Sequence, residues 1–468
     1  MPGLPTKSSP ASSVNSLSRA LTLLHLGGVT RRSELTTRLG LTRTATGTVL
    51  RELEQLGLVV TRTDGRRGSG TGRPSHGVEI GPGAPMVIAV QVGVETMLVA
   101  EAGLGAVLGP ITEVPLPDPP TPEALLGLVV DRVRLVLDRA TRPCAGIGVA
   151  LPSSVGSDGA ALAAHDLYWP SAVPARTVLA GLLASLGHGL FPLTVGNDAN
   201  LAALGESRHG AGRGAHNLLM LMTGQQGVGG GLVIEGRPYT GSAGVALEVG
   251  HLPVANDRLC HCGNAGCLAA EADPKALLEA VGGRGAGRTL AAARDVVVAA
   301  GTDPAARAAV SKITDRLAAG LASLVNVLNP DRIVLGGLYA DLLRASEMQL
   351  RAGLAYRSFL DHAAAVDLRP AARAAVSKIT DRLAVGLASL VNVLNPDRIV
   401  LGGLYADLLR ASDMQLRAGL AYRSFLDHAA AVDLRPAALP HPALVGAAEL
   451  ALQPLLDDPR RAAMTRSA

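Results

Sequence analysis

Apolar residues near the start of the chain recur with the spacing of short amphipathic helices. The pattern predicts a helix over 16–26, which a pair of glycines ends. Two further helices are expected over 33–39 and 42–56, with Ser33 and Thr42 as their N-caps. Three short helices separated by tight turns are typical of a helix-turn-helix.

The apolar pattern becomes strand-like after the third helix. Residues 58–60 and 78–80 predict two short strands, and the segment between them is rich in glycine and arginine. This arrangement predicts a wing, so we interpret residues 1–80 as a winged helix-turn-helix domain. These residues hold eleven Lys or Arg against five Asp or Glu, while the whole chain has a net charge of only +4. The excess of basic residues favours a polyanionic partner.

The residues that would contact DNA lie on the third helix and in the wing. Side chains of the helix can reach base edges and phosphates in a major groove, and wing arginines can neutralise phosphates or enter a minor groove. The candidates are Arg43, Thr44, Thr46, Thr48 and Arg51 on the helix, and Arg66, Arg67 and Arg73 in the wing. A small helical dimerisation module is the alternative, but the helices, the basic loop and the charge together favour operator DNA.

From Pro85 onward, apolar strand-like segments alternate with amphipathic helices. This alternation predicts an α/β body over 85–468. Hydrophobic residues make up 48% of the chain and charged residues 18%, which excludes a disordered protein. No apolar run reaches the roughly 20 residues of a membrane helix, and residues 1–15 lack the apolar segment of a secretory signal. We therefore expect a cytoplasmic protein that does not associate with membranes.

The C-terminal part of the body contains a tandem duplication. Residues 304–369 recur as 370–435 with two differences, Ala319 against Val385 and Glu347 against Asp413. Only one copy can occupy a given place in a compact fold, and the sequence does not say which. One alternative is that the additional copy prevents the second half of the body from folding.

Four residues have the types and spacing of a structural zinc site. Cys260, Cys262 and Cys267 lie within eight residues, and His251 precedes them by nine. One nitrogen and three sulfur donors suit tetrahedral Zn²⁺. A reducing compartment also favours metal ligation over disulfides for clustered cysteines. We therefore predict structural zinc as a cofactor, whereas the isolated Cys144 is interpreted as a core residue.

The motifs of the chain, taken in order, resemble those of the ROK family of repressors and sugar kinases. The resemblance includes a Gly-Arg-Pro wing and covers nearly the whole chain. Its motifs are GRP at 72–74, GIGVALP at 146–152, GNDAN at 196–200, GVGGGLVIEG at 227–236, LEVGH at 247–251, CHCGNAGC at 260–267 and NPDRIVLGG at 329–337, repeated at 395–403. It implies a winged helix-turn-helix followed by a two-lobed, actin-like or ribonuclease H-like sugar kinase fold.

The resemblance also implies a sugar site. By this resemblance the residues that contact the sugar are Asn197, Asp198, Glu248 and His251. Asp198 corresponds to the general base of the kinases. From the residues alone, an Asx-type turn would be the commoner explanation for Asn197 and Asp198. Asp166, Tyr168 and Trp169 are candidates for the entrance to the same cleft, although Trp169 could serve packing only. We expect a sugar or sugar derivative as the small-molecule effector.

The phosphate-binding segments depart from the pattern of the kinases. The carboxylate expected in the first phosphate turn is replaced by Gln91, and Glu95 adds a negative charge there. The second turn reads Gln225-Gln226-Gly227, and Ala269 replaces a glutamate expected to contact the sugar. ATP and Mg²⁺ are therefore not expected as cofactors.

These observations together predict a DNA-binding transcriptional regulator, a repressor that responds to a sugar. We expect it to bind a pseudo-palindromic operator as a homodimer or tetramer. The alternative is an active ATP-dependent sugar kinase with Asp198 as general base.

Overall fold

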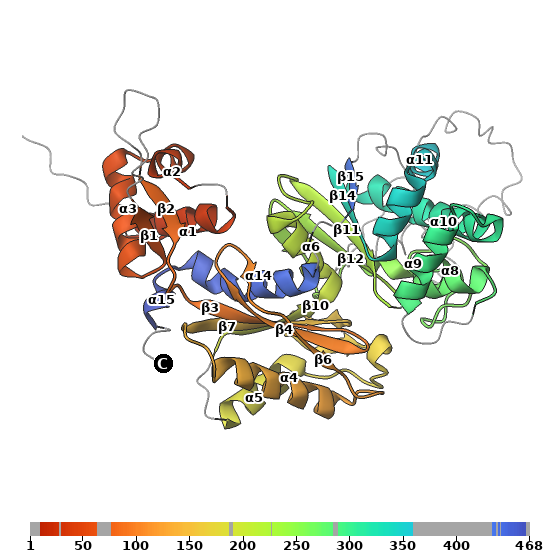
Figure 1. Ribbon diagram of the computed structural model, residues 1–468, viewed down its shortest axis with the longest axis horizontal. Helices are drawn as coiled ribbons and strands as arrows, with labels where there is room; N and C mark the ends of the chain where they lie inside the picture. Colours follow the sequence, from red (N-terminus) through yellow and green to blue (C-terminus); the bar gives the residue numbers. More distant parts are fainter. Residues whose placement is uncertain are drawn as a thin grey trace, which may run out of the picture. The chain divides into compact units, whose positions relative to one another are not determined.

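The computed structural model describes residues 10–27, 30–62, 76–186, 191–225, 227–283, 289–358, 433–436, 439 and 441–464. The chain forms two compact units, which we call unit 1 and unit 2. Unit 1 consists of Met1–Leu151, Val173–Gly196 and Leu444–Ala468, and unit 2 of Pro152–Ala172 and Asn197–Ala443. Each unit is built around one larger sheet (Figure 1).

Unit 1 begins with three helices and a two-stranded antiparallel sheet, as the sequence predicts. The elements are α1 (Pro10–His25), α2 (Arg32–Leu39), α3 (Arg43–Gln55), β1 (Val59–Arg62) and β2 (Gly77–Ile80). The hydroxyl of Thr42 accepts a hydrogen bond from Ala45 N and caps α3, which confirms the predicted cap. The prediction that Ser33 caps α2 is wrong. Arg31 forms a β-bridge with Gly77, so the backbone is extended up to Arg31 and the helix begins at Arg32.

The larger sheet of unit 1 has the strand order β10-β7-β3-β4-β5, and β6 also pairs with β4. The strands are β3 (Met86–Val92), β4 (Thr96–Gly103), β5 (Val107–Leu108), β6 (Thr112–Pro115), β7 (Cys144–Leu151) and β10 (Leu193–Asn197). Figure 1 shows α4 (Pro122–Leu137) and α5 (Ala175–Ser185) on one face and α14 (Pro442–Asp457) on the other. The short helix α15 (Arg461–Met464) follows α14.

Two glycines of β7 explain how closely α14 approaches the sheet. A Cβ at Gly148 would collide with the backbone carbonyl of Ala447, and one at Gly146 would lie 3.2 Å from Ala451 O. Every residue of β7 is buried. The Gly-x-Gly pattern of this strand therefore provides for the close packing of α14 against it.

The sheet of unit 2 has the order β13-β12-β11-β14-β15. Its strands are β11 (Asn217–Thr223), β12 (Val228–Ile234), β13 (Arg237–Tyr239), β14 (Arg332–Gly336) and β15 (Asp433–Pro436). The helices are α6 (Asp198–His209), α7 (Leu268–Ala272), α8 (Pro274–Ala280), α9 (Thr289–Ala299), α10 (Pro304–Leu328) and α11 (Leu338–Ser358). Short elements complete it: β8 (Ser154–Val155), β9 (Ala161–Ala163), η1 (His165–Leu167) and η2 (Val249–His251). These elements give unit 2 the predicted α/β character.

The duplicated segment enters this sheet from both copies. The first copy supplies α10, β14 and α11, whose apolar residues form much of the buried core of unit 2. The last three residues of the second copy, followed by Pro436, form β15, which pairs in parallel with β14. Residues 359–432, which include most of the second copy, lie outside the described residues. The first copy therefore supplies much of the core of unit 2, and the end of the second copy supplies the strand at the sheet edge.

No helix in the described ranges has the length and apolar character that crossing a membrane requires.

Candidate ligand and metal sites

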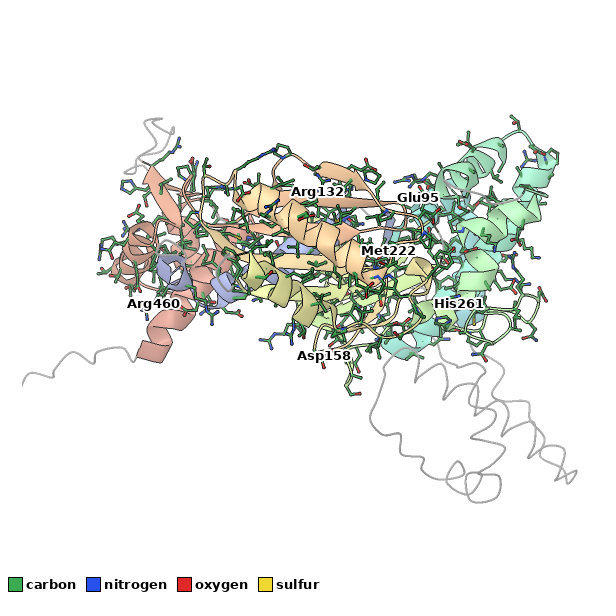
Figure 2. All side chains as sticks on the ribbon, turned by 90° about the horizontal axis from the view of Figure 1, so that it is seen from below. Glu95, Arg132, Asp158, Met222, His261 and Arg460 are labelled. Carbon is green, nitrogen blue, oxygen red and sulfur yellow. The ribbon has the colours of Figure 1, made fainter. Side chains whose placement is uncertain are left out.

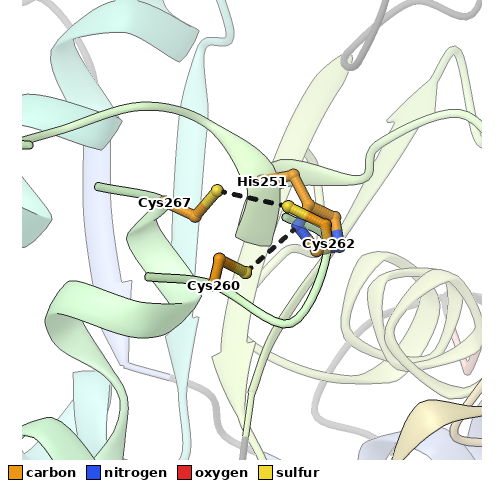
Figure 3. A group of neighbouring side chains, drawn as sticks. All are labelled: His251, Cys260, Cys262 and Cys267. Carbon is orange, nitrogen blue, oxygen red and sulfur yellow. Dashed lines mark hydrogen bonds between the residues drawn. The ribbon is translucent and has the colours of Figure 1, made fainter. Parts of the chain in front are cut away.

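The predicted zinc ligands lie together on a loop of unit 2 (Figure 3). The loop is closed by β-bridges between Pro253 and Cys267 and between Leu259 and Ala265. Gly266 has φ +77°, and any side chain there would collide with the carbonyl of Ala255, so the tight turn requires glycine. His251 approaches the loop from the end of η2.

The geometry of the four donors fits a tetrahedral ion. The sulfur atoms of Cys262 and Cys267 are 3.7 Å apart, and Cys260 Sγ lies 3.7 Å from His251 Nδ1. Two thiolates bound to one zinc at about 2.3 Å in tetrahedral geometry are about 3.8 Å apart. Burial raises the pKa of the Cys260 and Cys267 thiols, so a cation is needed to hold them as thiolates near neutral pH. The residues present therefore fit Zn²⁺.

A buried glutamate that the sequence analysis did not single out supports this loop. Glu271 Oε1 accepts a hydrogen bond from Arg258 N at 3.0 Å, and its other oxygen lies 3.7 Å from Arg316 Nε. Arg316 also donates to Asp257, on the same loop. The side chain of Glu271 is thus engaged by the zinc loop and by α10.

The second predicted site lies where β10 ends and α6 begins. The Asn197 side chain accepts a hydrogen bond from Asn200 N and so caps α6. Its amide nitrogen donates to Ser153 O at 3.0 Å and to Asp198 Oδ1 at 3.3 Å. Asp198 also accepts from Ala199 N at 2.8 Å. The local role weighed from the sequence is thus a helix N-cap rather than an Asx-type turn, and these hydrogen bonds hold both side chains in place.

The carboxylates of this site act on one another. Burial, followed by the negative charges of Asp166 and Glu248, raises the pKa of Asp198 to about 7. Glu248 precedes η2 and accepts a hydrogen bond from Ser154 Oγ at 2.7 Å. The structure thus brings Asn197, Asp198 and Glu248 together within unit 2. It places His251 at the end of η2, with Nδ1 directed at the zinc cluster.

Ser153 and Ser154 are contacts that the sequence analysis missed. They directly follow β7, a fully buried strand whose apolar sequence ends at Leu151 and Pro152. Polar residues just after the carboxyl end of a buried strand of an α/β sheet are candidates for a binding site. That signal was available in the sequence, but nothing local indicated that Glu248, 94 residues away, would be the partner of Ser154.

On α3, four of the five predicted DNA contacts are exposed: Arg43, Thr44, Thr48 and Arg51. The hydroxyl of Thr48 accepts a hydrogen bond from Arg51, so both lie on one face of the helix. The prediction for Thr46 is wrong. Its side chain is 0% exposed and donates to Thr42 O, because this position faces the core of the three helices.

The predicted wing arginines, Arg66, Arg67 and Arg73, lie outside the described residues.

The phosphate segments are described separately in the two units. In unit 1, Gln91 lies near the end of β3, and its Oε1 is buried without a hydrogen-bond partner in the described structure. In unit 2, Gln225 Oε1 accepts a hydrogen bond from Leu290 N in the first turn of α9 at 2.9 Å. The backbone N–H of Leu290 at the start of α9 therefore donates to a neutral amide oxygen, although a helix N-terminus favours an anion.

The sequence of the chain was compared with those of known protein families. The model of the ROK family matches residues 87–343, more than half of the chain. The chain belongs to the ROK family. This ROK protein is 28% identical to the xylose repressor of Caldicellulosiruptor bescii over 56% of its own length. It is 34% identical to the kanosamine kinase of Amycolatopsis mediterranei over 46% of its own length and 68% of the kinase. It spans only 60% and 67% of two Caldicellulosiruptor repressors.

Solved structures show the same fold. A ROK family transcriptional regulator described as a homologue of the Escherichia coli Mlc protein matches 97% of this ROK protein and 98% of its own chain, with a TM-score of 0.64 and 18% identity. A ROK glucokinase from Streptomyces griseus matches 79% of it, with a TM-score of 0.53 and 22% identity. The regulator match thus covers the N-terminal helices as well as the body.

Proposed function

We propose that this ROK protein is a DNA-binding transcriptional regulator, a repressor whose DNA affinity responds to a sugar. The observation that carries the proposal is the exposed face of α3, which bears Arg43, Thr44, Thr48 and Arg51. This helix belongs to the N-terminal helices that precede the ROK body. This face presents cationic and hydroxyl side chains to a major groove. The fold shared with the regulator and the similarity to xylose repressors support the proposal. We infer a homodimer, or a tetramer of two such dimers, because paired recognition helices match a pseudo-palindromic operator.

The sugar would bind at Asn197, Asp198, Glu248 and His251. The amide of Asn197 and the carboxylates of Asp198 and Glu248 are groups that hydrogen-bond hydroxyls of a sugar ring. Asn197 is fixed by Ser153 O and Glu248 by Ser154 Oγ, so both are oriented before a ligand arrives. Zn²⁺, held by His251, Cys260, Cys262 and Cys267, would crosslink the loop to the end of η2 and keep His251 beside the site.

A sugar kinase is the second candidate, and one observation favours it. A carboxyl with a pKa of about 7, as in Asp198, is suited to act as general base toward a hydroxyl near neutral pH. Two observations oppose a kinase. Gln225 Oε1 already accepts the hydrogen bond of Leu290 N, and the first phosphate turn holds Gln91 and Glu95. The use of one helix N-terminal donor by Gln225 and the loss of the expected carboxylate at Gln91 weaken the positioning of ATP phosphates, which carries most of the catalysis in phosphoryl transfer. We therefore favour sensing over phosphorylation.

The experiment that tests the proposal starts with DNA selection. The full chain is used to enrich fragments of genomic DNA, and the affinity for an enriched fragment is measured by fluorescence anisotropy over a range of salt concentrations. We expect Arg51→Ala to weaken binding by about tenfold and to reduce the dependence on salt, since one phosphate or base contact is lost.

Arg176→Ala is the matched control, because Arg176 is an exposed arginine on α5. It should bind like the unaltered protein. Failure to enrich any fragment, or equal losses in both variants, would contradict DNA binding by α3. A coupled ATP assay over a sugar panel addresses the second candidate, and turnover that Asp198→Asn abolishes would establish it.

A further inference from the structure

A glycine lies in the interior of α3, where the sequence could have used a better helix former. Gly47 is the fifth of the 13 residues of this helix, and glycine is less favourable than alanine there because it loses more backbone freedom on folding. A Cβ at Gly47 would lie 2.5 Å from Nη2 of Arg32, so the side chain of Arg32 lies directly over the glycine. The missing Cβ therefore makes room for an arginine that comes from α2.

Contacts at both ends hold Arg32 in this position. Its backbone N donates to His76 O at 3.0 Å, and the preceding residue, Arg31, forms a β-bridge with Gly77. Its Nη2 donates to the backbone oxygen of Arg43, the first residue of α3, at 3.0 Å. The backbone of Arg32 is thus fixed by the segment that enters β2, and its guanidinium by α3.

Arg51 approaches the same point from the next turn of α3. Its Nη1 lies 3.7 Å from the position that a Cβ at Gly47 would occupy, and its Nη2 donates to Thr48 Oγ1 at 3.0 Å. The guanidinium groups of Arg32 and Arg51 therefore both lie beside Gly47. Among the residues that the structure describes, no carboxylate forms an ion pair with either group.

Two other arginines near these elements are neutralised by carboxylates. Arg460, labelled in Figure 2, directs Nε and a terminal nitrogen at Oε1 of Glu52 on α3, each at 2.8 Å. Arg62 Nε, at the end of β1, lies 3.0 Å from Glu79 Oε2 on β2. Two neighbouring cations without such partners repel each other, and an anion bound by both removes the repulsion. The two guanidiniums beside Gly47 therefore provide a site for an anion.

A phosphate group suits two neighbouring guanidiniums. Its oxygens accept charge-assisted hydrogen bonds from donors on several sides, and the planar guanidinium presents paired N–H groups that match them. The exposed Thr44 and Thr48 belong to the same helix, so a phosphate at this site would lie beside the side chains that are candidates for base contacts.

We propose that Arg32 and Arg51 together hold one backbone phosphate of the DNA, and that Gly47 is required so that Arg32 can reach it. The proposal rests on the proposed function, because it adds Arg32, which the sequence analysis did not single out, to the same DNA-binding face. A phosphate contact fixes the register of a protein on the duplex and carries no sequence information of its own.

The first test measures the affinity of the full chain for an enriched DNA fragment and for a scrambled one. Arg32→Ala should weaken binding to both by about tenfold and lower the slope of log affinity against log salt concentration by about 1. Arg38→Ala is the matched control, because Arg38 is an exposed arginine on another side of α2, and it should bind like the unaltered protein. A loss confined to the enriched fragment would indicate a base contact and overturn the phosphate assignment. Equal losses in Arg38→Ala would reduce the effect to net charge.

Gly47→Ala should change stability and affinity in opposite directions. Alanine favours the helix, so the midpoint of denaturant unfolding should rise, while displacement of the Arg32 guanidinium should weaken DNA binding by about tenfold. In the Arg32→Ala background, Gly47→Ala should leave the affinity unchanged within about twofold, since no guanidinium remains to be displaced. A further loss in that background would mean that the glycine makes room for the DNA itself, which contradicts its proposed role.

Duplexes that carry a single neutral methylphosphonate locate the contact. One position should weaken binding by the unaltered protein, and the same position should have no effect in either Arg32→Ala or Arg51→Ala. If the two variants become insensitive at different positions, the arginines hold separate phosphates, and the shared site is refuted while DNA binding by α3 stands. If the unaltered protein enriches no DNA fragment, the proposed function fails, and this proposal fails with it.

Discussion

At the scale of single residues, the structure shows how position decides what a polar side chain can do. Thr46 and Thr48 are two residues apart on α3, yet one is buried against Thr42 and the other is exposed beside Arg51. Asp198 is a further case. Its pKa is raised by burial and by neighbouring carboxylates, while its hydrogen bond from Ala199 N acts in the opposite direction.

The raised pKa of Asp198 predicts a dependence of stability on pH. The folded state binds the proton of this carboxyl more tightly than the unfolded chain, in which its pKa is 3.8. Its contribution is therefore complete below about pH 4 and is lost as the pH rises through about 7. Asp198→Asn should remove this loss, so that the variant gains about 3 kcal/mol relative to the unaltered protein between pH 5 and pH 8.

Thermal or denaturant unfolding at several pH values measures this difference. Asp158→Asn, at an exposed aspartate of unit 2, is the control and should follow the unaltered protein. An equal pH dependence in Asp198→Asn and the unaltered protein would show that Asp198 titrates normally.

At the scale of elements, the loop that carries Cys260, Cys262 and Cys267 is shaped by contacts within a short stretch of chain, whereas the C-terminal helix α14 is placed by contacts with distant residues. The four metal donors come from one short stretch of chain, and the loop geometry follows from glycines and bridges within it. Spacing alone was therefore enough to predict the cluster. The contact between His25 on α1 and Glu449 on α14 joins residues 424 positions apart, and no periodicity in either helix indicates it.

Loss of the metal should destabilise unit 2. Cys262→Ser removes one thiolate from the set, so we expect zinc content to fall well below one ion per chain and the unfolding temperature of unit 2 to drop. The loss should be a sizeable part of the roughly 10 kcal/mol that structural zinc contributes in small zinc-dependent domains. Metal analysis and calorimetry check both values.

His261→Ala serves as the control for this prediction. His261 contacts Cys260 Sγ at 3.9 Å and packs edge-on against His251, but it is not among the four clustered donors. It should retain the metal. Zinc loss in His261→Ala together with zinc retention in Cys262→Ser would mean that the ligand set is assigned wrongly.

At the scale of the whole molecule, the sequence predicted the order of the helices and strands, but not which copy of the duplicated segment supplies the last strand. The α/β class, the N-terminal helices, the two wing strands and the α3 cap follow from local pattern, since each depends on neighbouring residues. The origin of the last strand does not. Asp433–Pro436 and the identical tetrapeptide 367–370 have the same local signals, so only the completed sheet shows that β15 comes from the second copy.

Removing one copy should leave unit 2 intact. Deleting residues 367–432 joins α11 to β15 through 8 residues in place of 74 and preserves the sequence of every described strand and helix. Closing the shorter connection costs less entropy, so we expect stability to rise by up to about 2 kcal/mol. Denaturant unfolding and zinc content check this outcome. A deletion variant that fails to fold or loses zinc would show that the second copy supplies more than β15.

The duplication also bears on how this region tolerates mutation. The apolar residues that α10, β14 and α11 bury in unit 2 all recur 66 positions later, because the two differing positions are the partly exposed Ala319 and Glu347. A missense change such as Leu335→Asp therefore leaves an undamaged version of the same segment, with Leu401, in the same polypeptide. Only if that second version takes the place of the damaged one in the sheet would a screen that alters one codon at a time score the stretch as dispensable, and paired changes at both positions separate that case from one in which the first copy alone is needed.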